Sequence, residues 1–385
     1  MYILNLAELS VAEFLNQYWQ KKPLLIKGGF KNFVDPLTAD ELAGLATEEE
    51  IESRIVSCVD KQWDMQTGPF EDFSEFGDKG WTLLVQAVDH WHPLAAKLLD
   101  PFRFIPNWRI DDLMVSFSTP GGGVGPHLDQ YDVFIIQGEG KRHWRVGMPD
   151  SNLQQLCPHP RLLQVSPFVD CIDVITEPGD ILYIPPGCPH DGISVENSLN
   201  YSVGFRAPAQ KDLLTGLADH LIDNDISGQR FSDAKRSAAT SVGRIDETDL
   251  NQIQQLLQQL VADRNQLPHW FGNLITRAKH ELDLNEPDPH YGEDEIAEYI
   301  DEGSVLSRTG GLRCCYYQQH NDSDLLLFIN GDQITLPPDE LLTAQLLCDN
   351  TELAAAENRH WPGDRQLGHG QGNVPWQTQR TGCLV

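Results

Sequence analysis

The chain has 385 residues, of which 40% are hydrophobic and 22% charged, as expected for a folded protein of two or three domains. Its 57 acidic and 28 basic residues give a formal net charge of -29. This balance argues against binding along the phosphates of a nucleic acid, and no direct DNA binding is expected. The negative charge is compatible with a basic protein as partner or substrate. The acidic residues could equally serve only to keep the protein soluble.

The sequence also carries signals about its compartment. The first ten residues, "MYILNLAELS", lack the pattern of a signal peptide, and no apolar run reaches the length of a membrane span. The eight cysteines are scattered without a CxxC pair, so neither a disulfide framework nor a zinc site is predicted. We therefore expect a cytoplasmic protein with reduced thiols and no membrane association.

Short helices and strands are predicted before residue 110. Ser10 is a good N-cap for a helix over "SVAEFLNQYWQ" (residues 10–20), and "KKPLLIKGGF" (residues 21–30) predicts a short strand that closes in a glycine turn. Apolar positions at helical intervals in "WTLLVQAVDHWHPLAAKLL" predict a helix over residues 81–99.

Residues 110–207 have a different pattern. Short β-rich runs alternate with Gly, Pro and Asp in "DLMVSFST", "DVFIIQGEG", "RHWRVG", "DVITEPGD", "ILYIPPG" and "NYSVGFRAP". Such spacing predicts an antiparallel barrel or sandwich.

Residues 209–284 are predicted to be helical. Two apolar stripes have helical spacing: Leu213, Leu214, Leu217, Leu221 and Ile222, then Leu250, Ile253, Leu256, Leu257 and Leu260. A dimer interface and simple packing on the barrel explain such stripes equally well.

An acidic, proline-containing linker, "NEPDPHYGEDE", precedes a predicted small α+β unit. "DEIAEYIDEG" is typical of a helix, while "SVLSR", "LRCCYYQQ", "LLLFING" and "QITLP" are typical of strands. From about residue 359 the composition changes to Gly, Gln and Arg without periodicity. We expect an atypical, poorly ordered tail there, produced by a shifted reading frame or a replaced segment.

The stretch "GGGVGPHLDQYDVF" (residues 121–134) is open to two interpretations. Glycines that open a helix could hold a phosphate, but no Gly-Lys-Ser/Thr follows, and the residues after Gly125 alternate as in a strand. On a strand, His127 and Asp129 would project from one face. They would then be two ligands of a two-histidine, one-carboxylate iron site.

The third ligand is predicted from "GDILYIPPGCPH" (residues 179–190), where the spacing of Gly179, Pro185, Gly187 and His190 resembles the second motif of a cupin barrel. His190 would return toward the first strand and complete a set of His127, Asp129 and His190. The alternative is a structural His–Asp hydrogen bond plus an unrelated turn histidine.

An open iron site of this kind usually takes a co-substrate such as 2-oxoglutarate, whose far carboxylate needs a cation. The basic run "GEGKRHWRVG" offers four candidates: Lys141, Arg142, His143 and Arg145. Arg142 is preferred because a bidentate guanidinium suits a carboxylate and its strand could lie deep in the barrel.

Polar residues on two neighbouring runs could donate further hydrogen bonds, although ordinary sheet polarity explains them equally well: Ser116, Ser118, Asn200 and Ser202. The pair Asp111–Asp112 is interpreted as the start of a strand, or as a paired-acid site that faces a basic substrate side chain.

At these residues the chain resembles the JmjC-type Fe(II)/2-oxoglutarate oxygenases, and within them the bacterial ribosomal oxygenases of the YcfD type. The similarity is carried by "FLNQYWQKKPLLIKGGF", "WTLLVQAVDHWHP", "WRIDDLMVSFSTPGGGVGPHLDQYDVFIIQGEG", "PGDILYIPPGCPHDG" and "NYSVGFRAP", and it runs over residues 10–345.

The resemblance implies a mainly β fold with helices: a cupin (double-stranded β-helix) JmjC domain over residues 1–208, a helical dimerisation region over 209–284, and a winged-helix-like α+β domain over 285–385. It implies Fe(II) held by His127, Asp129 and His190, with dioxygen and 2-oxoglutarate as co-substrates. The co-substrate would contact Arg142 and Ser116.

The family hydroxylates an arginine β-carbon of the sixteenth large-subunit ribosomal protein, so a homodimeric arginine hydroxylase with a ribosomal protein as substrate is expected. Two alternatives stay open: a JmjC-type oxygenase with another protein substrate or a demethylase outcome, and a non-catalytic cupin that serves as a binding module.

Overall fold

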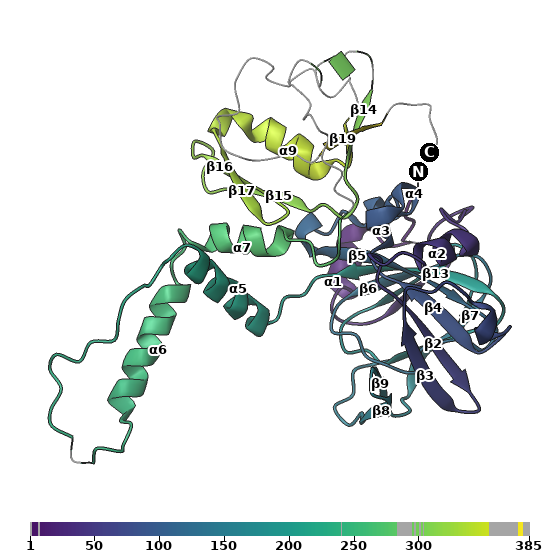
Figure 1. Cartoon of the computed structure of the whole chain (residues 1–385), viewed down its shortest axis with the longest axis horizontal. Helices are drawn as coiled ribbons and strands as arrows, with labels where there is room; N and C mark the ends of the chain where they lie inside the picture. The colour runs from purple at the N-terminus through teal and green to yellow at the C-terminus, as the bar shows by residue number, and fades with distance from the viewer. Residues whose placement is uncertain are drawn as a thin grey trace.

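The computed structural model describes residues 2–6, 8–239, 241–282, 295, 298–299, 302, 304–353 and 376–379. A β-rich part holds the first half of the chain, and a smaller α+β part lies beside it (Figure 1). Between them in sequence lies a helical segment whose last helix contacts the α+β part and whose middle helix extends away from both parts. The predicted linker over 285–295, the helix over 294–303 and the tail from residue 359 lie almost wholly outside the described residues.

The N-terminal elements begin with α1 (Val11–Gln17), for which Ser10 is the N-cap as predicted. The structure adds a capping box: the Ser10 hydroxyl accepts from Glu13 N, and the Glu13 carboxylate accepts from Ser10 N. The predicted strand is β1 (Leu24–Ile26). The elements that follow, up to residue 109, are α2 (Ala39–Leu45), β2 (Ser53–Val59), β3 (Gln62–Thr67), η1 (Ser74–Phe76), β4 (Trp81–Val85), α3 (Val88–Trp91), α4 (Pro93–Ala96), η2 (Asp100–Phe102) and η3 (Asn107–Arg109).

The predicted helix over 81–99 is wrong in its first part, because Trp81–Val85 is the strand β4. All five residues are buried, and the strand pairs with β2 on one side and β5 on the other. A short apolar run covered on both faces has no polar alternation, so periodicity cannot distinguish it from a buried helix. Two short helices, α3 and α4, follow, with Pro93 at the start of the second.

The barrel predicted over 110–207 is confirmed as two antiparallel sheets. Its strands are β5 (Ile110–Ser118), β6 (Val133–Gln137), β7 (Arg142–Gly147), β8 (Gln155–His159), β9 (Leu162–Val165), β10 (Asp170–Thr176), β11 (Ile181–Ile184), β12 (His190–Ser194) and β13 (Ser198–Phe205). The larger sheet has the order β1-β11-β6-β13-β5-β4-β2-β3, the smaller one β10-β7-β12, and β8 and β9 form a separate hairpin.

Strand β6 shows how the two sheets and the helices enclose the core. Its five residues are all buried. Phe134 and Ile136 belong to the core that also holds Phe14 of α1, whereas Val133 and Ile135 pack with Trp144 and Val146 of the smaller sheet. One face of the larger sheet is therefore covered by helices, and the other forms the barrel interior.

The strand predicted over residues 126–134 is shorter than expected. Regular pairing starts only at Val133, and residues 126–132 run as a loop that contains one isolated antiparallel bridge, His127 to His190. The main-chain groups of His127 thus pair with a single partner, and the segment need not follow a flat sheet.

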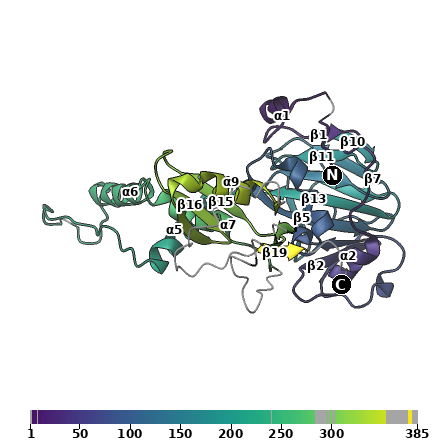
Figure 2. The same ribbon diagram turned by 90° about the horizontal axis from the view of Figure 1, so that it is seen from above.

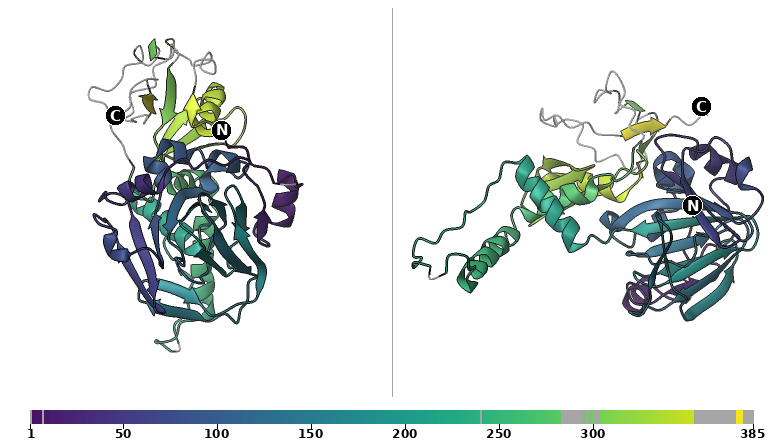
Figure 3. Two further views of the ribbon diagram at one scale, coloured as in Figure 1. Left: turned by 90° about the vertical axis from the view of Figure 1, so that its right-hand side faces the viewer. Right: turned by 60° about the horizontal axis from the view of Figure 1, so that its bottom comes forward.

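The predicted helices of residues 209–284 are α5 (Gln210–Asp223), α6 (Glu247–Val261) and α7 (Leu267–Thr276). None of the residues of α6 is buried, and this helix stands away from the barrel in Figures 1 and 2 and in the right panel of Figure 3. Packing of α6 on the barrel, one of the two interpretations of its apolar stripe, does not occur in this chain.

The α+β part contains the four predicted strands and a helix against them. Its described elements are β14 (Val305–Arg308), β15 (Cys314–Gln318), β16 (Leu325–Ile329), β17 (Asp332–Leu336), η4 (Pro338–Glu340), α9 (Leu341–Asp349), β18 (Glu352–Leu353) and β19 (Trp376–Gln379). Strands β15, β16 and β17 form one sheet, and β14 lies between β18 and β19 in another. Among the described residues, no helix is long and apolar enough to cross a membrane.

Candidate metal centre and co-substrate site

The structure brings His127, Asp129 and His190 together. One potential ligand atom from each lies within 4.8 Å of the others. The Nε2 of His190 is 3.6 Å from Asp129 Oδ2, and the two imidazole rings are 4.2 Å apart between centroids. His190 is buried, while His127 and Asp129 are half-buried, so the cluster is open on one side.

Main-chain hydrogen bonds hold the three residues in place. His127 N donates to His190 O and His190 N donates to His127 O, both at 3.0 Å. Gly187 N donates to Asp129 O at 2.9 Å. The loop that carries His127 and Asp129 is therefore hydrogen-bonded both to His190 and to Gly187, three residues before it. These bonds join two segments that are distant in the sequence.

The imidazole tautomers follow from the acceptors beside them. The Nδ1 of His127 lies 2.9 Å from Gly125 O, and the Nδ1 of His190 lies 3.0 Å from Cys188 O. A carbonyl only accepts, so each Nδ1 carries the proton and each Nε2 keeps its lone pair for a metal. Burial, aided by the neighbouring His127, lowers the pKa of His190 to about 4, so this ring is neutral at physiological pH.

Two neutral imidazoles and one carboxylate are the donor set that suits Fe(II) with open coordination positions. The described residues fit such an ion in number, chemistry and separation. A structural His190–Asp129 hydrogen bond does not describe this contact, because the two atoms are 3.6 Å apart and a neutral ring with its proton on Nδ1 has none on Nε2 to donate.

Arg142, the predicted co-substrate residue, is buried inside the barrel. Its Nη2 donates to Ser118 Oγ at 2.6 Å and to Ser198 Oγ at 3.2 Å, and its Nη1 lies 3.4 Å from Ser116 Oγ. Burial lowers the pKa of Arg142 to about 9, which still leaves it protonated near neutral pH. No carboxylate of the described residues forms an ion pair with Arg142, and its Nε has no hydrogen-bond partner among them.

A buried cation surrounded only by neutral hydroxyls is costly unless an anion joins it. The indole Nε1 of Trp144 and the Oδ1 of Asn200 are also among the buried polar atoms that lack partners in the described part of the chain. The Trp144 ring lies between the two halves of the site, 5.9 Å from the Arg142 guanidinium carbon and 6.2 Å from the His190 ring. The arrangement fits an anionic molecule that reaches from Arg142 to the histidines.

The other sequence candidates are placed differently. Ser116 is near Arg142 as predicted, but Asn200 donates instead to Gln137 Oε1 at 3.1 Å. Three basic residues have acidic partners outside the barrel interior: Lys141 with Glu177, His143 with Asp173, and Arg145 with Asp191.

Sequence reasoning missed Ser198 and Trp144. Ser198 is two residues before Asn200 and Trp144 two residues after Arg142, so strand alternation from the predicted residues was the signal that could have found both.

The acidic pair on β5 is divided between two roles. Asp111 accepts from Arg206 at 2.8 Å and Lys279 at 2.6 Å, so it is a structural ion pair. Asp112 is buried and accepts only from the Gln86 side chain and Ala87 N in the described structure. Burial and the neighbouring Asp89 raise the pKa of Asp112 to about 6.

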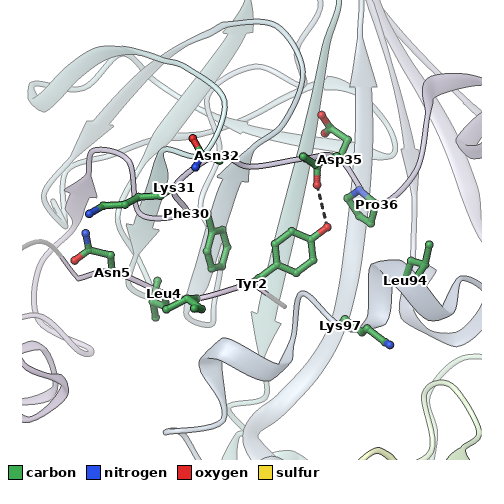
Figure 4. Close-up of a pocket in the computed structure, with 12 residues that line it drawn as sticks. Tyr2, Leu4, Asn5, Phe30, Lys31, Asn32, Asp35, Pro36, Leu94 and Lys97 are labelled. Carbon is green, nitrogen blue, oxygen red and sulfur yellow. Dashed lines mark hydrogen bonds between the residues drawn. The ribbon is translucent and has the colours of Figure 1, made fainter.

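A hollow of about 940 Å³ lies elsewhere, beside the N-terminal segment (Figure 4). It is lined by twelve residues, Tyr2, Phe30, Pro36 and Leu94 among them, and by none of the site residues. Its labelled side chains do not converge on one point, and the Tyr2 hydroxyl there donates to Val34 O at 2.9 Å. This hollow therefore contributes nothing to the metal centre or the Arg142 site.

Comparison with known proteins agrees with this geometry. The family model described as a JmjC domain matches residues 97–213, and the ROXA-like winged helix matches residues 255–363. The ribosomal protein uL16 3-hydroxylase of Escherichia coli is 47% identical over 90% of this chain and 91% of its own. A probable ribosomal oxygenase of Haemophilus influenzae is 30% identical over 86% of this chain and 84% of its own.

Solved structures give the same result. An X-ray structure of E. coli YcfD has a TM-score of 0.85 at 46% identity and covers 93% of both chains. A structure of this ribosomal oxygenase in complex with cobalt and 2-oxoglutarate has a TM-score of 0.82 at 44% identity, covering 93% of this chain and 92% of that one. The chain therefore belongs to the ribosomal oxygenases of the JmjC family.

Proposed function

We propose that this protein is an Fe(II)- and 2-oxoglutarate-dependent hydroxylase of ribosomal protein uL16 that modifies the β-carbon of an arginine side chain. The observation that carries the proposal is the cluster of His127, Asp129 and His190 beside a buried, unpaired Arg142. The similarity to a uL16 3-hydroxylase over nine tenths of the chain supports the substrate.

The three clustered side chains would hold the iron on one face and leave the other face for ligands. When bound, iron supplies the activation of dioxygen, which is coupled to decarboxylation of 2-oxoglutarate to succinate and to hydroxylation of a C–H bond. The chain's own contribution is positioning: the carbonyls of Gly125 and Cys188 fix each imidazole so that its Nε2 faces the ion.

Arg142 would bind the carboxylate of 2-oxoglutarate that is distant from the metal. The hydroxyls of Ser118 and Ser198 orient the guanidinium, and Ser116 lies at its other side. A fixed, water-free guanidinium binds a carboxylate bidentately. Asn200 is retained as a candidate contact because its Oδ1 is buried and lacks a partner in the described structure.

Asp112 is the side chain that we propose to receive the guanidinium of the substrate arginine. A Cβ built on Gly204 would point toward Asp112 Oδ1, 3.5 Å away, so this carboxyl lies on the face of β13 that also carries Ser198. Asp112 thus borders the same interior as Arg142, with a raised pKa that a cationic partner would lower.

We also propose that the protein forms homodimers in the cytoplasm through its helical segment. The apolar residues Leu250, Ile253 and Leu257 follow one face of α6 and are 51%, 44% and 60% exposed. Leu214 and Ile222 of α5 are exposed as well. A stripe of this kind on a helix that contacts no barrel strand indicates burial against a second helix.

The domain boundaries at 1–208, 209–284 and 285–385 are kept as part of this proposal. They are supported by the JmjC match to residues 97–213. The winged-helix match starts earlier than the proposed third domain, at residue 255, and thus includes the second half of α6 and all of α7.

The test is reconstitution with iron, 2-oxoglutarate and recombinant uL16. We expect succinate formation and the mass of one added oxygen on an arginine of uL16, and no such product on the same protein with that arginine replaced by lysine. Turnover of 2-oxoglutarate with another protein, or loss of a methyl group, would identify a different JmjC reaction. If the protein binds iron and 2-oxoglutarate tightly but turns over no ribosomal protein, the remaining interpretation is a non-catalytic cupin that serves as a binding module.

A further inference from the structure

Two thiols face each other in the α+β part, away from the metal centre. Cys314 lies at the start of β15 and Cys348 near the end of α9, and both are buried. The two residues are adjacent: the Sγ of Cys314 lies 3.2 Å from the carbonyl oxygen of Leu347, the residue before Cys348, and both cysteines belong to one apolar core. Neither thiol contributes to the hydroxylase site.

The guanidinium of Arg308 lies beside both cysteines. Arg308 of β14 points Nη1 at the Sγ of Cys314, 2.6 Å away, and also lies 3.2 Å from Leu347 O. In its neutral form the Cys314 thiol donates to Leu347 O at 3.2 Å. When Cys314 ionises, the Arg308 and Cys348 donors both stabilise the negative sulfur.

This arrangement makes the two cysteines chemically unequal. The hydrogen bond from Cys348 and the charge of Arg308 lower the pKa of Cys314, against the opposing effect of burial. The same hydrogen bond, with burial, raises the pKa of Cys348. One thiol is thus prepared to be a nucleophile, and the other keeps its proton.

A small cavity gives access to the nucleophile. It has a volume of about 20 Å³ and is lined by Cys314, Arg308, Arg313 and Arg103, among others. A cavity of this size admits a molecule comparable to water. Its arginine lining favours small polar or anionic reagents over apolar ones.

We propose that Cys314 and Cys348 form a redox-active pair that hydrogen peroxide converts into a disulfide. The Cys314 thiolate attacks one peroxide oxygen, the O–O bond breaks, and Cys314 becomes a sulfenic acid as hydroxide leaves. The Cys348 sulfur then attacks the Cys314 sulfur, the S–O bond breaks, and the Cys348 proton leaves with the oxygen as water. The two thiols lose two electrons and two protons, and one peroxide is reduced to two waters.

The disulfide would link α9 to β15 at the junction between the two parts of the molecule. Asn107, from the JmjC part, donates its Nδ2 to the Cys348 carbonyl at 2.8 Å. The disulfide would therefore form in the last turn of α9, which the JmjC part contacts through this hydrogen bond.

The test treats the folded, full-length protein with hydrogen peroxide and maps its cysteines by mass spectrometry. We expect a Cys314–Cys348 disulfide to form before the exposed thiols of Cys157 and Cys171 are oxidised. The Cys348→Ser variant should stop at a sulfenic acid on Cys314 that dimedone traps. The Cys314→Ser variant should form neither the disulfide nor a sulfenic acid on Cys348.

Arg308→Met should slow the reaction near neutral pH by roughly threefold for each unit by which the pKa of Cys314 rises, because the thiolate fraction falls while the more basic thiolate is intrinsically more nucleophilic. Circular dichroism before and after treatment establishes that each sample is folded. The proposal is wrong if Cys157 and Cys171 oxidise while the pair stays reduced. It is also wrong if the disulfide appears only in urea.

Discussion

Arg142 on β7 and Ser118 on β5 meet inside the barrel with 2.6 Å between guanidinium nitrogen and hydroxyl oxygen. The two strands belong to different sheets, β10-β7-β12 and the larger one. This contact therefore places a cation between the two sheets, and Trp144 separates it from His190. The distance between the co-substrate's anchor and the metal ligands is set by the barrel itself.

Replacing Arg142 by methionine should raise the KM for 2-oxoglutarate by at least about 30-fold, since losing one partner of a buried charge pair costs roughly 2 kcal/mol or more. The protein without ligand should melt at the same or a higher temperature, because a buried unpaired charge has been removed. Steady-state kinetics and calorimetry measure both effects.

Lys141→Met is the matched control, since the neighbouring cation is exposed and paired with Glu177. An unchanged KM in Arg142→Met would show that the co-substrate binds elsewhere.

Asp129→Ala should lower iron affinity by more than about 100-fold, because even partners outside the direct ligand set cost 10- to 100-fold. The fold should survive, since the bond from Gly187 N is made to the Asp129 main chain. Metal titration and thermal melting measure the two effects. Asp173→Ala, an exposed carboxylate paired with His143, should bind iron normally; equal losses in both variants would argue against the ligand set.

The sequence predicted the site better than it predicted the backbone that carries it. His127 and Asp129 were placed together through strand alternation, whereas the structure has a loop with one bridge to His190. The three side chains still come together because the bridge holds His127 and the hydrogen bond from Gly187 N holds Asp129.

The strands of residues 110–207 that sequence reasoning missed have no local pattern. The hairpin of β8 and β9 contains Pro158 and mostly exposed residues in its first strand. Strand β12 is only five residues long, "HDGIS", and its first residue is the proposed ligand His190. Such strands are defined by their partners in the sheet, which a local reading does not contain.

Asp112 predicts a pH effect. Its pKa in the folded protein, about 6, exceeds the value near 4 of an unfolded chain, so the folded state binds the extra proton between these values. Its contribution to the free energy of unfolding is therefore lost as pH rises from about 4 to about 6. Asp112→Asn should abolish this loss and raise stability above pH 6 by on the order of 3 kcal/mol.

Urea unfolding of both proteins at about pH 4.5 and about pH 7, set from these pKa values, measures the difference. The amide oxygen of the substituted side chain can still accept from Gln86 and Ala87, so the packing is retained. A stability difference that does not depend on pH would contradict the assignment. Weaker uL16 binding by the stabilised variant would support the proposed role of Asp112.

Substituting serine for Leu250, Ile253 and Leu257 together should turn a dimer into a monomer, since these residues form the exposed apolar face of α6. Sedimentation velocity measures the assembly, and 2-oxoglutarate binding by the variant should persist because the barrel is untouched. The double variant Gln255→Ser and Gln259→Ser alters exposed polar positions of the same helix and should stay dimeric. A monomeric wild-type protein would refute the proposal.

Gly121 and Gly125 allow a matched test of the loop that carries His127. Both have left-handed φ angles, +77° and +78°, so alanine at either costs about 1–2 kcal/mol in backbone strain. A Cβ at Gly121 meets nothing within 4 Å, whereas at Gly125 it would lie 2.0 Å from Gln164 Nε2 and 3.0 Å from Trp63. Only Gly125→Ala should therefore displace a neighbour.

The displaced neighbour holds the loop in place. Gln164 donates to Val124 O at 2.9 Å, and Val165 N, next to it on β9, donates to Pro126 O at 2.8 Å. Gly125 O also fixes the His127 ring. We expect both variants to lose similar stability from backbone strain but only Gly125→Ala to lose iron affinity, by about tenfold or more, as for other residues that orient a ligand. Equal iron affinities in the two variants would show that the β8–β9 hairpin does not position His127.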